Sequence, residues 1–199
     1  MLHVHRPDRP APAAILSAMF AARKQVFVDL LKWDVPVLEN RYEADQFDDV
    51  HAVYLVLTDA SGGHLGSTRL LPTLRPHLLD SFYATLCDVP PPSGEAIREV
   101  TRFCLDRSLR AAERRRVRDT LVVALADHAL AQGIASYTAI AETGWLQQIL
   151  TFGWRCRPLG IPRPVDGRSL GALQIFIDAD TPRLLAAAGL SEHPALLAA

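Results

Sequence analysis

The segment Arg98-Glu99-Val100-Thr101-Arg102-Phe103-Cys104 places reactive side chains in the pattern of a buried strand. A carboxylate, a hydroxyl and a guanidinium occur there within a few positions, and buried charges require partners or a ligand. A period of two would turn Glu99 and Thr101 to one face and Arg102 to the other. If Glu99 and Arg102 serve one site, the strand must bulge or end near them.

Arg23 is a second charged residue in an apolar pattern. It lies between Phe20 and Phe27 on one face of a predicted helix. Such an arginine either extends along the helix to reach solvent or crosses the core boundary to meet a carboxylate. Guanidinium suits the second role, because it stays charged and binds carboxylates in a bidentate manner.

An acidic cluster that contains Glu43, Asp45 and Asp48 follows Trp33. It could be a solvated loop, or a calcium site, although the Gly and the final Glu of an EF-hand loop are missing. It could also bind a cationic ligand, for which carboxylates and an indole are suitable partners. Arg69 adds a charge within a predicted strand, where Gly66 would permit close approach of a ligand.

The overall composition excludes several classes of protein. The chain has 199 residues, which predicts one domain, and a net charge of −1 gives no reason to expect a nucleic-acid partner. Its three cysteines form no C-x-x-C pair, which argues against a disulfide framework or a zinc site. The longest apolar run, near Leu121–Ala131, contains Asp127 and His128 and is too short to span a bilayer. We therefore expect a soluble, cytoplasmic protein that does not bind a membrane.

Hydrophobic periodicity predicts alternating strands and helices around these residues. The expected strands are Leu2–His5, His51–Thr58, Leu65–Leu71, Arg98–Cys104, Ser136–Ala141 and Leu173–Ile177, with a hairpin turn at Asp59–Gly63. The expected helices are Ala13–Leu31, Leu78–Leu86, Val117–Gln132, Thr143–Phe152 and Thr181–Ala188. Trp33–Asp49 is expected to be irregular. This order is typical of a mixed-sheet α/β domain.

The order and spacing of the charged and aromatic residues closely resemble the motif set of the acyl-homoserine lactone synthases, the autoinducer synthases of bacterial quorum sensing. The residues that carry the resemblance are Arg23, Phe27, Trp33, Glu43, Asp45, Asp48, Arg69, Phe82, Glu99, Thr101, Arg102 and Phe103. It implies a fold like that of GCN5-related N-acetyltransferases (GNAT), with a mixed, V-shaped sheet flanked by helices. It also implies two substrates: S-adenosylmethionine, and an acyl thioester of acyl carrier protein or, in some members, of coenzyme A.

The implied activity is that of an acyltransferase. It joins the acyl group to the amine of S-adenosylmethionine, closes the lactone and releases methylthioadenosine. Glu99 is the candidate general base, and Asp45 and Asp48 would orient the amine or complement the positive charge. With Arg102 these residues form the expected catalytic set. No metal and no permanently bound cofactor are required.

The remaining motif residues are expected to bind S-adenosylmethionine. Arg23, Arg69 and Arg102 are candidate anchors for the methionine carboxylate and organisers of the acidic cluster. Phe27, Trp33 and Phe103 would wall the adenosyl pocket. Glu43, Phe82 and Thr101 complete the expected substrate-binding set.

The second half of the chain is expected to hold the acyl donor. Within a single domain over residues 1–199, residues 1–103 would form the catalytic half and 104–199 the acyl half. Six arginines form either a solvated face or a surface that docks an acidic carrier protein or coenzyme A phosphates: Arg107, Arg110, Arg114, Arg115, Arg116 and Arg118. The Gly-rich pyrophosphate loop of ordinary acetyltransferases is absent, which favours a carrier-protein donor.

An apolar pocket must accommodate the acyl chain. The candidates are Val122, Leu125, Tyr137, Ile140, Thr143, Trp145, Leu146, Ile149 and Phe152, although such residues are also typical of an ordinary core. Two other functions remain open at this point. One is a GNAT-type N-acetyltransferase that uses acetyl-coenzyme A, and the other is a non-catalytic module that binds a carrier protein.

Overall fold

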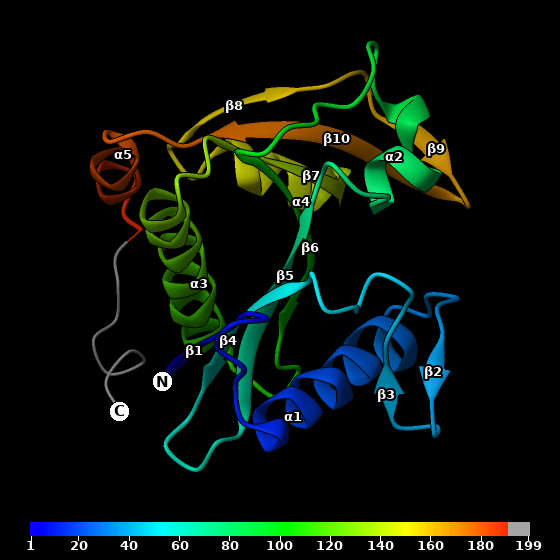
Figure 1. Ribbon diagram of the computed structural model, residues 1–199, viewed down its shortest axis with the longest axis vertical. Coiled ribbons are helices and arrows are strands. Elements are labelled where there is room, and N and C mark those ends of the chain that lie inside the picture. Colours follow the sequence, from blue (N-terminus) through cyan, green and yellow to red (C-terminus); the bar gives the residue numbers. More distant parts are fainter. Residues whose placement is uncertain (191–199) are drawn as a thin grey trace. The chain divides into compact units, whose positions relative to one another are not determined.

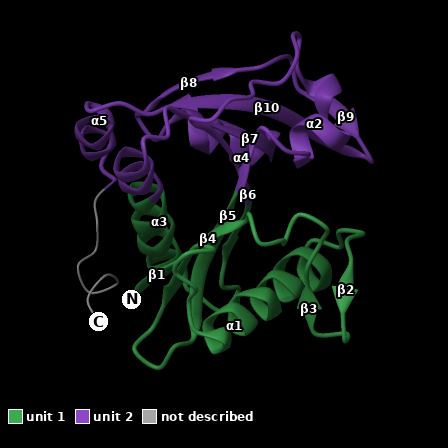
Figure 2. Cartoon of the chain, viewed as in Figure 1, with its two compact units in different colours: residues 1–70, 102–124, 192–199 green, residues 71–101, 125–191 purple. Residues whose placement is uncertain are grey.

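A computed structural model describes residues 1–190 of the chain. Among these residues the chain divides into two compact units (Figure 2). Unit 1 comprises residues 1–70 and 102–124, and unit 2 comprises residues 71–101 and 125–190. The units therefore alternate along the chain.

Unit 1 contains three neighbouring antiparallel strands, β1 (Leu2–His5), β4 (Val53–Thr58) and β5 (His64–Pro72, whose last two residues belong to unit 2) (Figure 1). The predicted hairpin of β4 and β5 is confirmed, with Val53 opposite Leu70. Its turn is closed by Asp59, whose carboxylate accepts hydrogen bonds from the backbone N–H groups of Ser61 and Gly63.

Gly66 of β5 serves protein packing. A Cβ atom at this position would lie 2.8 Å from the side chain of Val117 and 3.1 Å from that of Leu105, so the strand can approach these residues only without a side chain. The interpretation of Gly66 as a point of ligand approach is therefore wrong.

The helical segment of unit 1 is less regular than predicted. The helix α1 ends at Arg23 (Ala13–Arg23), and a π-helical segment, η1 (Lys24–Leu30), continues it. The wider turn is visible in the hydrogen bond from the N–H of Leu31 to the carbonyl of Val26, which is five residues earlier. Insertions of this kind are frequent at functional sites.

The stretch expected to be irregular contains a small hairpin, β2 (Val37–Leu38) and β3 (Tyr42–Glu43). Glu39 and Asn40 form its turn, with left-handed φ values of 51° and 54°. The strands are too short for a periodic signal, which is why the sequence does not reveal them. The hairpin places Glu43 beside α1.

Unit 2 has the strand order β6-β7-β10-β8. These strands are β6 (Ile97–Leu105, whose last four residues belong to unit 1), β7 (Ser136–Glu142), β10 (Arg168–Phe176) and β8 (Arg155–Pro158), and β9 (Arg163–Val165) also pairs with β10. The pair β6–β7 is parallel, whereas β10 is antiparallel to its neighbours, so the sheet is mixed as predicted. The strands β8 and β9 were not predicted, because Arg and Pro dominate residues 155–165 and such residues suit only an edge.

Helices connect and cover these strands (Figure 1). They are α2 (Leu78–Phe82), the 3-10 turn η2 (Ala84–Leu86), α3 (Ala111–Gln132), α4 (Thr143–Leu150) and α5 (Thr181–Ala187). The helix α3 begins six residues before the predicted Val117, because its first turns are exposed and rich in arginine, a good helix former without an apolar pattern. No helix within residues 1–190 has the length and hydropathy to cross a membrane.

Candidate active site

Six charged side chains of unit 1 form one buried network: Arg23, Glu43, Asp45, Asp48, Arg69 and Arg102. None of these side chains is more than 7% exposed. Three guanidinium groups face three carboxylates, so the network is neutral as a whole. Such burial is tolerable only because each charge has partners with good geometry.

Arg23 links the helix α1 to both ends of the acidic cluster. Its Nε donates to Glu43 at 2.5 Å, and its two terminal nitrogens donate to the two carboxylate oxygens of Asp48 at 2.8 and 2.9 Å. Its side chain is only 1% exposed. Of the two alternatives for this residue, the one in which it meets a carboxylate is therefore confirmed.

Arg69 and Arg102 complete the network from strands β5 and β6. Arg69 binds Asp45 in a bidentate manner, at 2.6 and 3.0 Å, and lies 2.8 Å from Asp48. Arg102 donates to Glu43 at 3.0 Å and to Asp45 at 2.8 Å. The acidic cluster is thus held by arginine side chains, and residues 1–190 contain no set of three or more potential metal ligands placed to hold an ion.

Tyr54 is a member of this site that the sequence analysis missed. Its hydroxyl donates to Asp48 at 2.8 Å from strand β4, where it sits among aliphatic residues and is 4% exposed. Burial alone would raise the pKa of Asp48, but hydrogen bonds and charge from Arg23 and Arg69 outweigh it and hold that pKa well below its usual value. Burial and the charge of Asp48 together raise the pKa of Tyr54.

An aromatic pair borders the network. Phe27 of η1 and Trp33 stack with ring centroids 4.6 Å apart and an angle of 17° between their planes. The guanidinium carbon of Arg102 lies 5.7 Å from the centroid of Phe27 and 5.9 Å from that of Trp33, within the range of cation–π attraction. The sequence-predicted aromatic residues are thus brought together with Arg102.

The strand β6 departs from regular geometry at Arg102, near which the sequence predicts a bulge or a strand end. Arg102 has a left-handed φ of 50°, which is uncommon for a residue with a side chain and typical of functional or strained positions. This conformation directs Arg102 to Glu43 and Asp45 in unit 1. The predicted irregularity is therefore present, and a shared role for Arg102 and Glu99 remains a prediction.

Glu99 lies in unit 2 and has a different kind of environment. It is fully buried, and its two carboxylate oxygens accept hydrogen bonds from the backbone N–H groups of Leu78 and Leu79, at 2.8 and 2.9 Å. These are the first residues of α2, whose N–H groups have no partner within the helix. The carboxylate thus has a fixed orientation at the start of this short helix.

The other predicted contact residues differ in exposure. Thr101 and Phe103 of β6 are half-buried, whereas Phe82, the last residue of α2, is 60% exposed. Their contribution to substrate binding remains a prediction.

The predicted acyl-pocket residues occupy α3, β7 and α4. Val122, Leu125, Tyr137, Leu146, Ile149 and Phe152 are buried, while Thr143 is half-buried and its hydroxyl donates to Ser169. Trp145 and Phe152 make an edge-to-face contact at 5.7 Å. Tyr137 donates to the carbonyl of Leu125, whereas Ile140 packs against the cluster of Leu79 and Leu86. The assignment of these residues to an acyl pocket remains a prediction.

The predicted docking arginines gather around the start of α3. Arg107, Arg110, Arg114, Arg115 and Arg116 are exposed, and Arg118 is half-buried and paired with Asp119. Exposed guanidinium groups on one short segment are compatible with either a solvated face or an anionic partner.

Comparison with known proteins gives three findings. The family model of the autoinducer synthases matches residues 11–185. An acyl-homoserine-lactone synthase of Ralstonia nicotianae is 33% identical over 189 residues, which cover 92% of this chain and 92% of that protein. The coenzyme A-dependent acyl-homoserine lactone synthase BjaI, solved with methylthioadenosine and also with S-adenosylmethionine and isopentyl-coenzyme A, is 28% identical with a TM-score of 0.86, over 96% of this chain and 90% of that one.

The fold extends to more distant proteins. The structure of a putative N-acetyltransferase from Lactobacillus plantarum has a TM-score of 0.60 at 17% identity, over 89% of this chain and 98% of that one. The fold class expected from the sequence, α/β and GNAT-like with a mixed sheet flanked by helices, is therefore confirmed.

Proposed function

The chain belongs to the autoinducer synthase family and is an acyl-homoserine lactone synthase, and on that premise we propose how its residues divide the reaction. In the first step the amine of S-adenosylmethionine attacks the thioester carbonyl, so that a C–N bond forms and the C–S bond of the donor breaks. The thiol leaves with one proton. In the second step the methionine carboxylate attacks its own γ-carbon, and methylthioadenosine departs as the lactone closes.

One observation supports the assignment of the S-adenosylmethionine site. Arg102 belongs to the neutral ionic network and also contacts the stacked rings of Phe27 and Trp33. Arg23 and Arg69 are almost completely buried and bound to carboxylates, so we assign them a positioning role. Asp45 and Asp48 act in the same way, because their oxygens already bind arginines. The network fixes the side chain of Arg102, which we assign to the methionine carboxylate.

The stack of Phe27 and Trp33 is proposed to wall the adenosyl group, with Phe103 as a further wall. Sulfonium carries a positive charge that aromatic faces attract, especially that of an indole. The sulfonium is also the leaving group of lactonisation. Folding the methionine chain against this wall brings its carboxylate towards the γ-carbon, and positioning of this kind can lower a barrier by roughly 7–11 kcal/mol in favourable cases.

Glu99 is proposed as the general base, directly or through a water molecule. Acylation requires a neutral amine, and a carboxylate with a fixed orientation can accept the amine proton. Hydrogen bonds from the backbone N–H groups of Leu78 and Leu79 fix the direction of both oxygens. These donors are backbone groups, so they do not depend on the side chains of Leu78 and Leu79.

The acyl donor is proposed to meet the residues of α3 and α4. The exposed arginines near the start of α3 would bind the phosphates of coenzyme A or the acidic surface of acyl carrier protein. The apolar residues of α3 and α4 would accommodate the acyl chain. S-adenosylmethionine and acyl thioesters are metabolites of the cytoplasm, where we propose that the protein acts.

Incubation of the purified protein with S-adenosylmethionine and matched acyl-coenzyme A and acyl-carrier-protein panels tests these assignments. We expect lactone and methylthioadenosine in equal amounts, and only when an acyl donor is present. A protein in which Arg110, Arg114 and Arg115 are replaced by Gln should show a raised KM for the donor and an unchanged KM for S-adenosylmethionine. An acyl-methionine derivative without methylthioadenosine, or an unchanged donor KM, would contradict the assignment.

A further inference from the structure

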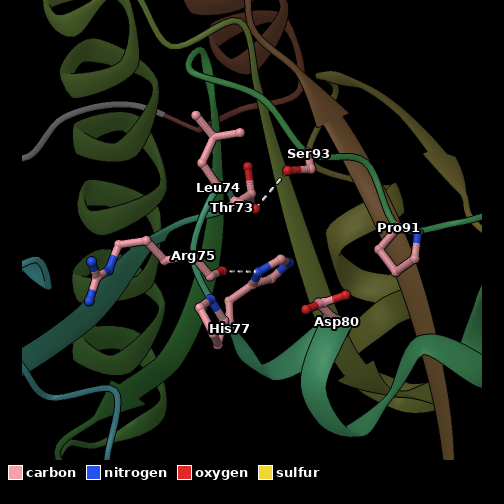
Figure 3. Close-up of a pocket in the computed structure, with 8 residues that line it drawn as sticks. Thr73, Leu74, Arg75, His77, Asp80, Pro91 and Ser93 are labelled. Atoms are coloured by element: carbon pink, nitrogen blue, oxygen red, sulfur yellow. Dashed lines mark hydrogen bonds between the residues drawn. The ribbon is translucent and has the colours of Figure 1, made fainter.

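A cavity in unit 2 lies beside the start of α2 and has no role in the steps above. It has a volume of about 270 Å³ and is lined by Thr73, Leu74, Arg75, Pro76, His77, Asp80, Pro91 and Ser93 (Figure 3). Cavities that bind drug-sized molecules are typically about 300–1,000 Å³, so this one suits a small ligand or one end of a larger ligand.

His77 provides a buried ring nitrogen, Nε2, beside this cavity. The residue is only 2% exposed, and its Nδ1 donates to the carbonyl of Arg75 at 2.8 Å. A carbonyl can only accept, so Nδ1 carries a proton, and in the uncharged form of the ring Nε2 is an acceptor. Nε2 is buried and has no hydrogen-bond partner among residues 1–190. An unpaired buried polar atom is costly, so a donor that reaches Nε2 would stabilise this site.

Asp80 gives the cavity a negative charge. Figure 3 shows its carboxylate on the side of the cavity towards which the ring of His77 points, while the guanidinium of Arg75 extends away from both. Within the described part of the chain, Asp80 has no ion pair. The two hydroxyls that line the cavity are already engaged: Ser93 donates to the carbonyl of Thr73, and Thr73 exchanges hydrogen bonds with Gly94.

The cavity thus presents a ring nitrogen and a carboxylate, and the guanidinium of Arg75, which also lines it, extends away from both (Figure 3). An anion would meet the charge of Asp80. A ligand with several N–H donors and a positive charge would satisfy both groups, and a primary ammonium group has these properties. The prolines and Leu74 provide apolar walls for the carbon chain that carries it.

We propose that His77 and Asp80 form a binding site for a primary ammonium group, with Nε2 of His77 accepting one N–H and the carboxylate of Asp80 balancing the charge. This inference rests on the proposed function in one respect: the amine of S-adenosylmethionine is the ammonium group that the reaction must hold. His77 immediately precedes Leu78 and Leu79, which donate to Glu99, so one segment would both hold the amine and orient the proposed base. A small free amine is the other ligand that carries such an ammonium group.

Nitrogen NMR of the histidine rings distinguishes the two candidate ligands, S-adenosylmethionine and a free amine. The signals of His77 are identified by their loss in His77→Gln, and three probes are added to the full-length protein: S-adenosylmethionine, methylthioadenosine and ethylamine. Methylthioadenosine shares the adenosyl group but has no ammonium. We expect S-adenosylmethionine and ethylamine to shift the Nε2 signal of His77 and methylthioadenosine to leave it unchanged. A shift with ethylamine alone would support the site and assign it to a free amine.

Asp80→Asn tests the charge without removing the histidine. We expect the Kd for S-adenosylmethionine to rise about tenfold, on the scale of one lost charge-assisted hydrogen bond, while the Kd for methylthioadenosine does not change. Asp166→Asn removes an exposed carboxylate of unit 2 outside the cavity and should change neither constant. If S-adenosylmethionine binds but neither it nor ethylamine shifts His77, the proposed site is wrong. If S-adenosylmethionine does not bind at all, the proposed function fails, and the ethylamine titration still decides the ammonium site.

Discussion

Carboxylates are buried in both units, and the two units hold them by different means. In unit 1, Asp45 and Asp48 are bound by the side chains of Arg23, Arg69 and Arg102. In unit 2, Glu99 is bound by two backbone N–H groups at the start of α2. A network of side chains depends on every member, whereas backbone donors remain when a side chain changes. Substitutions of Arg23, Asp48 and Tyr54 should therefore act mainly on stability, and substitution of Glu99 mainly on the reaction.

The largest effect on stability is expected from Arg23→Met. This change leaves Glu43 and Asp48 buried with fewer partners, and removal of one member of a buried ion pair typically costs about 3–5 kcal/mol. Chemical denaturation at pH 7 measures the loss. Arg116→Met, on the exposed start of α3, is the matched control and should change the unfolding free energy by less than about 0.5 kcal/mol. Equal losses in the two variants would mean that the network does not stabilise unit 1.

The second prediction concerns the pH dependence of the same network. The folded protein holds the pKa of Asp48 below its usual value, so the carboxylate contributes stability that is complete above the unfolded pKa of about 3.9 and is lost as the pH falls towards the folded pKa. Asp48→Asn should destabilise the protein at pH 7. The difference from the unchanged protein should shrink below about pH 3.9, by at most roughly 1.4 kcal/mol per pH unit. A difference that stays constant between pH 7 and pH 3 would contradict the ionic role of Asp48.

Tyr54→Phe should give the smallest effect. It removes one hydrogen bond to Asp48 and leaves the ring, which contacts Phe20 edge to face at 5.9 Å. A hydrogen bond to a charged group contributes about 1.5–3 kcal/mol, and the arginines that remain on Asp48 should keep the loss at the lower end of that range. Denaturation measures it, with Tyr83→Phe in unit 2 as the control. A loss of unfolding free energy as large as that of Arg23→Met would contradict this prediction and show that Tyr54 stabilises the network as much as Arg23 does.

The sequence predicted the parts of the fold that have a strong periodic pattern. The β4–β5 hairpin and the strands β6 and β7 lie where alternation placed them. The π-helical turn of η1, the two-residue strands β2 and β3 and the Arg- and Pro-rich strands β8 and β9 were missed. Such elements are too short or too polar to give a period, and tertiary contacts determine them.

The same contrast holds for the site. Charges within apolar patterns revealed Arg23, Arg69 and Arg102, because a buried charge needs a partner. Their pairing with particular carboxylates depends on the hairpin β2–β3 and on the left-handed conformation of Arg102, neither of which has a sequence signal. Tyr54 and His77 were missed because tyrosine is common in strands and a single histidine, a residue of intermediate burial, gives no sequence signal of its own. The backbone donors of Glu99 come from a helix terminus, which sequence types do not specify.

Single-turnover acylation by Glu99→Gln tests the central claim most directly. Gln keeps the shape of the side chain and one carbonyl oxygen for a backbone donor, but it cannot take a proton. The account predicts that this variant remains folded and binds S-adenosylmethionine with nearly the same Kd, while the rate of acyl-homoserine lactone formation falls by roughly 10²–10⁴-fold. An unchanged rate would remove Glu99 from the chemistry. A lost affinity for S-adenosylmethionine with an unchanged rate at saturation would make it a binding residue only.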